Sequence, residues 1–420
     1  MNSPTAADDS ENQSETKLPR RDWILLPLIG FFTLLFLAVS TELLARWLFP
    51  VSEVGFERCF ARKDLSGTAP VNPNSFCIEQ IAESRLPVEY RFDSRGHRAD
   101  TELRPKQPGT YRIVMIGSSM AMGLFVPADW SFAATLPKEL SQRTGRKIEL
   151  YNEAKGGRFR GGPFPFPGSA RNFKQVLAVN PDMILWIIAP MDIENADSAS
   201  TTPLQQGPMR GALTSDKEAP LSVNIWSKLS EAISNGTLGS KLLDRWQGSR
   251  TSLVLKHFLL GAESQGQYVT SYLKNEDDAG FLRAEPNSKW QHFLDVFQGD
   301  AEQFEQQAKA AGVPFVAVLL PNRAQAAMIS MGEWPKGYDP YKLDAELRSI
   351  VEDRGGIYID ILLSLRKIPS PEQYYFPVDG HLNVDGHAVL SKLLSERLTD
   401  GLVPALRADA QQQTVLEQRR

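Results

Sequence analysis

The feature that most constrains the fold is a regular alternation, beginning near Val88, between short apolar runs and longer segments with helical periodicity. The apolar runs lie at residues 111–116, 148–151, 183–188, 314–320 and 356–359. Runs that are apolar on both faces are typical of strands buried between two layers. The alternation therefore predicts an α/β fold, a three-layer sandwich in which helices cover both faces of a central parallel sheet.

The segments between these runs carry apolar residues at intervals of three and four positions, which predicts helices. They lie at residues 131–144, 170–178, 289–311, 342–354 and 383–399. The alternation stops between residues 194 and 287, where amphipathic stretches are interrupted by Gly, Ser and Asp. We expect a mostly helical insertion there, following the third strand of the sheet.

A second constraint is the uncharged segment at residues 23–41, which reads WILLPLIGFFTLLFLAVST. At 1.5 Å per residue its roughly 19 residues reach about 28 Å, close to the hydrocarbon thickness of a bilayer. The long polar leader before it favours a transmembrane signal anchor at 23–49 and a disordered cytoplasmic tail at 1–22. A cleaved signal peptide is the alternative, because residues 38–40 (Ala-Val-Ser) could form a cleavage site.

The orientation of this segment is indicated by cysteines rather than by charge, because basic residues flank both of its ends. The chain has two cysteines, Cys59 and Cys77. They fit one disulfide that closes a loop of about 18 residues, as in an oxidising compartment. Two unpaired thiols are the alternative, because spacing alone does not fix pairing.

These observations predict the order of the remaining segments. Residues 50–87 would form an extracytoplasmic connector, and residues 88–403 the main domain on the same side, either periplasmic or at the cell surface. A loose polar tail at 404–420 would follow. The net charge of -4 gives no basic field, so we do not expect nucleic-acid binding.

A candidate nucleophile lies at the end of the first predicted strand of the sheet. Ligands on an open parallel sheet gather at the carboxyl ends of its strands. The first strand runs directly into residues 117–123, which read GSSMAMG. Gly117 and Gly123 permit a tight turn, and a following helix would leave Ser119 near free backbone N–H groups. Ser119 is well placed as a nucleophile, although serines at such turns more often cap a helix.

The C-terminal segment at 376–387 contains the groups that such a serine would need. A serine hydroxyl requires an imidazole to take its proton and a carboxylate to orient that imidazole. Asp379 and His381 could supply both from one loop that enters a helix. His387 has the spacing of a buried helix face, so we expect it to be structural.

Together these segments resemble the SGNH/GDSL hydrolase superfamily, whose sheet is flavodoxin-like, over about residues 90–399. Four sequence blocks follow in the family's order, at 112–123, 152–157, 181–192 and 379–387. The resemblance implies a catalytic triad and an oxyanion hole, with no metal and no organic cofactor. The triad would be Ser119, Asp379 and His381, the oxyanion donors Ser119 and Gly157, and the site-supporting residues Gly117, Asn152 and Asp192.

Two residues depart from the pattern of the family. Ser118 replaces the Asp of Gly-Asp-Ser, which removes a carboxylate from the turn but keeps the nucleophile. Met191 replaces the Asn that precedes Asp192, which removes a side-chain donor to the oxyanion, worth about 2.7 to 4 kcal/mol of transition-state stabilisation. The last block has one residue between Asp and His instead of two, a variant that resembles polysaccharide O-acetyltransferase relatives.

We therefore expect a membrane-anchored serine ester hydrolase or O-acyltransferase that acts through an acyl-enzyme. By analogy with the family, the expected substrates are O-acylated cell-surface glycans. One alternative is a catalytically weak or inactive glycan-binding or assembly subunit, which Met191 and Ser118 favour. The other alternative is a lipid or carboxyl esterase with an apolar cleft under the insertion. The sequence identifies no protein partner.

Overall fold

The protein is described by a computed structural model, which covers residues 21–51, 59, 71–84, 86–99, 102–154, 170–194 and 249–407. Five strands of these residues form one sheet, in the order β4-β3-β5-β6-β7. They are β3 (Thr110–Gly117), β4 (Lys147–Asn152), β5 (Met183–Ile188), β6 (Phe315–Leu319) and β7 (Ile357–Ile359). Every pairing is parallel. Counted from β3, the order is 2-1-3-4-5, the flavodoxin-like arrangement, which confirms the predicted fold class.

The register of the central strands determines where the functional site can lie. Every residue of β3, β5 and β6 is buried, as expected for strands covered on both faces. In the pairing of β3 with β5, Gly117 lies opposite Ile187. The carboxyl ends of these two strands are therefore level, and the segments that follow them start side by side.

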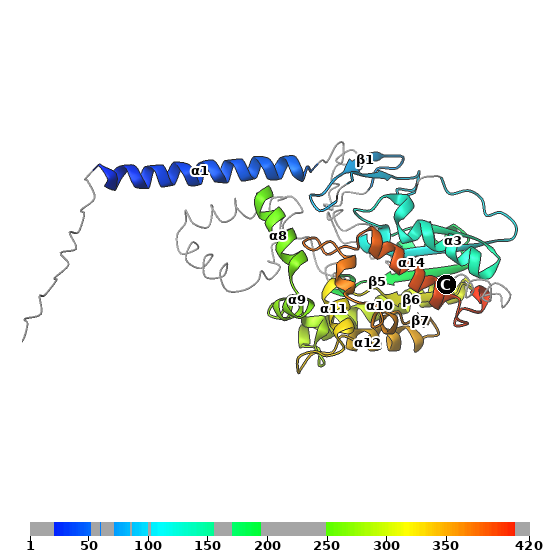
Figure 1. The fold of residues 1–420 in the computed structure, drawn as a ribbon. Helices are drawn as coiled ribbons and strands as arrows, with labels where there is room; N and C mark the ends of the chain where they lie inside the picture. The colour runs from blue at the N-terminus through cyan, green and yellow to red at the C-terminus, as the bar shows by residue number, and fades with distance from the viewer. Residues whose placement is uncertain are drawn as a thin grey trace, which may run out of the picture.

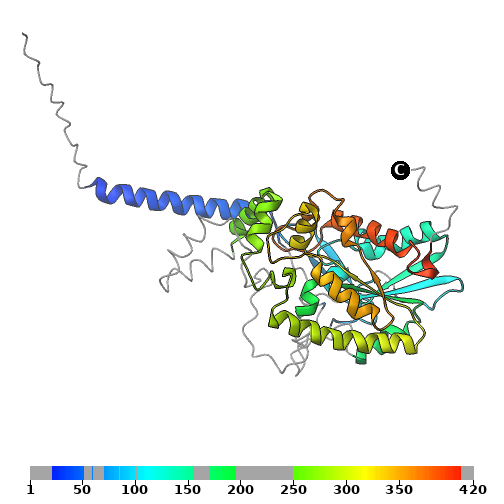
Figure 2. The ribbon, with the colours of Figure 1, turned by 90° about the horizontal axis from the view of Figure 1, so that it is seen from below.

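Helices cover the sheet in two groups (Figures 1 and 2). On one face, α3 (Phe132–Thr144) packs against α14 (Val384–Leu398). The other face is covered by α4 (Ala170–Ala178), α10 (Ser288–Ala310) and α12 (Lys342–Glu352). There the buried Trp186 of β5 stacks on Phe297 of α10, with ring centroids 4.9 Å apart. The remaining short elements are α2 (Ser119–Met122), η2 (Ala128–Trp130), α11 (Arg323–Met331), α13 (Leu362–Leu365), η5 (Pro371–Tyr374) and η6 (Pro404–Leu406).

The described part of the predicted insertion is helical. It contains α8 (Arg250–Ala262), α9 (Gln265–Tyr272) and the single turn η4 (Gly280–Leu282). Ser249 caps the start of α8, and a capping box of Ser264 and Gln267 begins α9. Residues 195–248 of the predicted insertion lie outside the described residues, as do residues 1–20 of the tail predicted at 1–22 and residues 408–420 of the tail predicted at 404–420. The C-terminal tail was predicted to start too early, because Pro404–Leu406 form η6 and Leu406 is buried.

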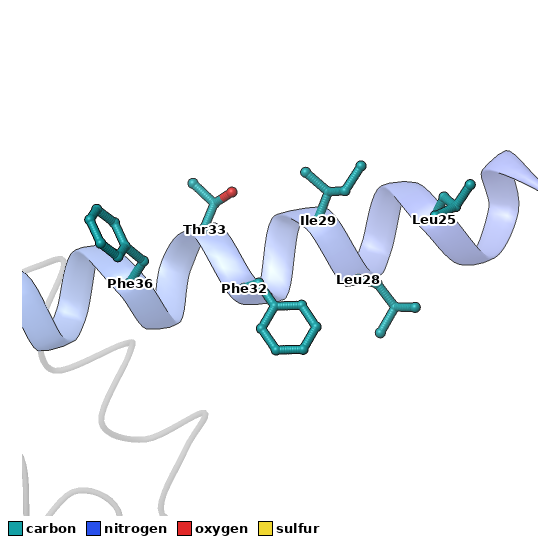
Figure 3. Close-up of a pocket in the computed structure, with 6 residues that line it drawn as sticks. All are labelled: Leu25, Leu28, Ile29, Phe32, Thr33 and Phe36. Atoms are coloured by element: carbon teal, nitrogen blue, oxygen red, sulfur yellow. The ribbon is translucent and has the colours of Figure 1, made fainter.

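The N-terminal helix α1 (Asp22–Leu48) extends away from the sheet domain (Figure 1). Its segment Trp23–Leu48 is, by length and composition, long and apolar enough to cross a membrane. Apolar side chains such as Leu28, Ile29 and Phe32 project outward from it (Figure 3). An N-terminal signal sequence would share this length and composition.

Between α1 and the sheet lies an antiparallel hairpin of β1 (Phe76–Glu79) and β2 (Val88–Arg91). A disulfide joins Cys59 to Cys77 of β1, with their Cα atoms 6.0 Å apart. Both cysteines and the neighbouring Tyr90 are buried in the main hydrophobic core. The hairpin spans the domain boundary predicted after residue 87, and its core is continuous with that of the sheet.

Candidate active site

The nucleophile turn, residues 117–123, connects β3 to the rest of the domain. At Gly117 an added Cβ would lie 2.6 Å from the carbonyl oxygen of Ile187 and 2.7 Å from the Cβ of Ala121. Only glycine fits at such a close approach of two strands and a helix. The chain turns here into α2, whose first residue is the buried Ser119.

The far end of the nucleophile turn is held by Arg98, which is buried. Its guanidinium donates hydrogen bonds to the carbonyl oxygens of Met122 (3.2 Å), Gly123 and Val126 (2.7 Å). The same group lies 4.5 Å above the ring of Tyr90 in the hairpin. The planar fork of an arginine suits several carbonyl acceptors at once. Arg98 therefore fixes the carboxyl end of α2, a role that the sequence did not reveal.

Ser119, His381 and Asp379 form a continuous hydrogen-bonded chain. The Nε2 atom of His381 lies 2.7 Å from the Oγ atom of Ser119, and its Nδ1 atom lies 2.5 Å from Asp379 Oδ1. A carboxylate at Nδ1 favours the tautomer that carries its proton there, which leaves Nε2 free to accept the serine proton. The side chains of His381 and Asp379 are 14% and 26% exposed, so a substrate can reach this chain from solvent.

The acid–base loop, residues 376–381, carries Asp379 and His381 and packs against Phe125. The rings of Phe125 and His381 meet edge to face with centroids 5.4 Å apart. Phe125 has a φ of 64°, an uncommon conformation for a bulky residue that the surroundings must hold in place. Its backbone N–H donates to the hydroxyl of Tyr90 at 2.9 Å. Through Tyr90 the hairpin thus contacts Phe125, which packs on the imidazole, and Arg98, which holds the nucleophile turn.

Asp192 lies in the helical segment 190–194 that follows β5, next to the nucleophile turn. Its carboxylate is buried and accepts a hydrogen bond from the backbone N–H of Ala189 at 2.8 Å. Burial raises the pKa of Asp192 to about 6, against the opposing effects of the Ala189 N–H, the Ser118 hydroxyl and the nearby His381. The position fits a residue that orders the turns around the site.

Of the two predicted oxyanion donors, Ser119 lies at the start of α2, and Gly157 lies outside the described residues. Asn152 connects β4 to α2, because its Nδ2 donates to the carbonyl oxygen of Ala121 at 3.2 Å. Its Oδ1 accepts from the backbone N–H of Ala154 at 3.0 Å. The side chain of Met191 is 42% exposed and has no hydrogen-bond donor to offer an oxyanion.

His387 lies apart from this chain of hydrogen bonds. It is buried in α14, stacks on Phe132 with centroids 5.4 Å apart, and its Nδ1 lies 3.2 Å from the backbone N of that residue. Burial lowers the pKa of His387 to about 3, so this imidazole is neutral and accepts the Phe132 N–H. These contacts fit the expected structural role. Among the described residues, no group of three or more His, Cys, Asp or Glu side chains could hold a metal ion.

No protein-family model and no curated protein matches the chain. Solved structures that it resembles include TesA, at 10% identity and a TM-score of 0.33, covering 70% of this chain and 99% of that one. A lipase/acylhydrolase from Enterococcus faecalis matches at 10% identity and a TM-score of 0.32, over 69% and 95% of the chains. A protein described as a GDSL-like lipase from Parabacteroides merdae matches at 12% identity and a TM-score of 0.33, covering 72% of this chain and 100% of that one.

These likenesses are remote, and the fold assignment rests on the strand order of the sheet itself.

Proposed function

We propose that this protein is an SGNH-type serine hydrolase or O-acyltransferase that acts on carboxylic esters. The observation that supports it best is the chain of hydrogen bonds from Ser119 through His381 to Asp379, at 2.7 and 2.5 Å. This chain lies at the carboxyl end of the parallel sheet, where open α/β sheets bind their ligands.

In the proposed mechanism, His381 Nε2 takes the proton of Ser119 as the Oγ atom attacks the ester carbonyl carbon. The carbonyl oxygen becomes an oxyanion, for which we propose the backbone N–H groups of Ser119 and Gly157 as donors. The intermediate then expels the alcohol, which takes its proton from His381, and leaves an acyl group on Ser119. Water or a sugar hydroxyl then gives a proton to His381 as its oxygen attacks the acyl carbonyl carbon. The second intermediate breaks its bond to Ser119 Oγ, which takes the proton back from His381, and the free acid or the acylated sugar leaves.

We further propose that α1 anchors the chain in a membrane and that the catalytic domain lies outside the cytoplasm. The apolar length of α1 and the buried Cys59–Cys77 disulfide support this orientation. An enzyme tethered at that surface would meet O-acylated glycans of the cell envelope. This substrate class rests on analogy with the family.

The test compares the full chain, purified in detergent, with its Ser119→Ala variant on p-nitrophenyl acetate and longer-chain esters. Turnover that requires Ser119 would support the proposal, and preference for short chains would separate a deacetylase from a lipid or carboxyl esterase. A glycan hydroxyl added as acceptor would reveal transfer, if acylated glycan forms in place of free acid. Equal rates for both proteins would contradict the assignment.

A catalytically weak glycan-binding or assembly subunit is the second candidate, and Met191 favours it. This residue lacks the donor that an Asn would offer to the oxyanion. Substituting Met191→Asn should raise kcat of a weak enzyme by about 10²- to 10³-fold. If Met191→Asn gives no gain in kcat and the Ser119→Ala variant still binds glycan, the binding subunit would be favoured.

A further inference from the structure

A buried carboxylate from outside the sheet contacts the acid–base loop. The side chain of Glu83, which follows β1, is only 4% exposed. Its Oε1 accepts the backbone N–H of Val378 at 3.0 Å, and its Oε2 accepts that of Asp379 at 2.8 Å. Both oxygens of one carboxylate therefore bind consecutive peptide groups, the second of which belongs to Asp379, the residue proposed to orient His381.

The same carboxylate also contacts α8. The Nδ1 atom of His257 lies 2.9 Å from Glu83 Oε1, and the His257 side chain is 29% exposed. At its own start α8 is bound to α1, because the carboxylate of Glu42 accepts the backbone N–H groups of Arg250 (3.0 Å) and Thr251 (2.9 Å). The two helices meet at this point (Figure 1). Hydrogen bonds thus connect the end of α1, through α8 and Glu83, to the acid–base loop.

The loop has few constraints of its own. Its backbone is closed by a bond from the N–H of Phe376 to the carbonyl oxygen of His381 at 2.8 Å and by one from Gly380 to Phe376 at 2.9 Å. These bonds fix the shape of the turn without fixing its place relative to Ser119. On the outer side, Arg323 donates to the carbonyl oxygen of Pro377 at 2.9 Å. Glu83 supplies charge-assisted bonds at the two following peptides, which are stronger than neutral ones.

We infer that Glu83 is a positioning residue of the proposed hydrolase. It holds the backbone at Asp379 so that His381 stays within hydrogen-bonding distance of Ser119, and His257 in turn holds Glu83. The inference rests on the proposed function. A displacement of about 1 Å at a catalytic group can cost about 10²-fold in rate, so loss of these bonds should lower kcat without changing substrate affinity.

The test is Glu83→Gln in the full chain, assayed with the ester that the wild type cleaves best. An amide keeps the size of the side chain but turns an NH2 group toward one of the N–H donors, where it cannot accept. We expect kcat to fall about 10- to 100-fold while KM stays within about twofold. Glu83→Asp, which keeps both acceptor oxygens, should recover part of the lost kcat.

Glu139→Gln is the matched control. Glu139 is a half-buried acceptor for the hydroxyls of Ser391 and Ser395 at 2.8 Å each, where α3 packs against α14. Its substitution should lower Tm and leave kcat near the wild-type value. The inference is overturned if Glu83→Gln keeps wild-type kcat, or if both variants lose kcat in proportion to their loss of Tm.

A second measurement separates this inference from the proposed function. If the wild type shows no turnover that depends on Ser119, the proposed function fails, and amide hydrogen exchange then tests the role of Glu83. Faster exchange at Val378 and Asp379 in Glu83→Gln, with no change in Glu139→Gln, would support the holding role. Unchanged exchange in both variants would overturn it.

Discussion

The two halves of the candidate site are built in different ways. Ser119 follows directly from β3, and the close approach at Gly117 and the short helix α2 determine its place. The acid–base loop lies between η5 and α14, outside the sheet, and depends on side chains far away in the chain, among them Phe125 and Glu83. The place of Ser119 is therefore set by the end of a sheet strand and by the bonds of Arg98 to the far end of α2, whereas the place of His381 depends on a loop outside the sheet and on the side chains that contact it.

The largest effect should come from removing the nucleophile. We expect Ser119→Ala to lower kcat by more than about 10⁴-fold, because no other hydroxyl is bonded to His381 Nε2 among the described residues. Thermal unfolding should change little, since alanine fits the space of a serine. A variant with residual turnover near the wild type would place the nucleophile elsewhere.

A slightly smaller loss of kcat should follow from a substitution in the acid–base loop. Asp379→Asn would keep the backbone bonds to Glu83 but offer an NH2 group to His381 Nδ1, which favours the wrong tautomer. We expect kcat to fall about 10³- to 10⁴-fold. Steady-state kinetics would check this, with circular dichroism as the control for folding. If Asp379→Asn kept full activity, Asp379 could not be the orienting acid.

The tight turn at Gly117 can be tested through the stability of the folded protein. Gly117→Ala would push a methyl group against the Ile187 carbonyl and Ala121, and we expect a loss of about 2 to 4 kcal/mol in the free energy of unfolding. Gly299→Ala is the control, because a Cβ there in α10 meets nothing within 4 Å. It should stabilise the helix by about 0.5 to 1 kcal/mol. Urea denaturation would measure the free energy of unfolding of both variants. Equal values for Gly117→Ala and Gly299→Ala would show that the turn is not tight.

A pH dependence should distinguish the helical segment around Asp192 from the rest of the core. Burial raises the pKa of Asp192 in the folded protein to about 6, above its ordinary value of 3.8, so its contribution to stability is full below about pH 4 and is lost as the pH rises through 6. The wild type should therefore lose about 2 to 3 kcal/mol relative to Asp192→Asn between pH 4 and pH 7. Measuring the free energy of unfolding of both proteins at a series of pH values would show this loss. A difference between the two proteins that stays constant with pH would contradict the raised pKa.

The sheet could be predicted almost completely from the sequence. The predicted strand at 111–116 is β3 (Thr110–Gly117), and the predicted helix at 131–144 is α3 (Phe132–Thr144). Hydrophobic periodicity identifies these elements because a helix buried on one face and a strand buried on both faces each leave a local pattern of apolar residues. Likewise, Ser119 and His381 could be proposed as partners because each lies in a recognisable sequence block.

The residues that support the site left no such pattern. Glu83, Arg98 and His257 are ordinary charged or polar residues in the sequence, and they gain partners only when the fold brings distant segments together. The left-handed backbone at Phe125 is also unexpected from its residue type. Local propensity carries no information about contacts between residues that lie tens to hundreds of positions apart.

The hydrogen bonds from Arg98 to the end of α2 have a consequence for the smallest part of this protein that can fold with its site intact. A chain cut just before β3 would keep every strand of the parallel sheet and yet lose Arg98 and Tyr90. The carbonyl oxygens of Met122 and Val126 would then lose their buried donors, and Phe125 would lose its hydroxyl partner. Such a truncated chain could keep its secondary structure and still misplace its serine. The smallest unit that would hold Ser119 in place therefore begins with the disulfide-linked hairpin.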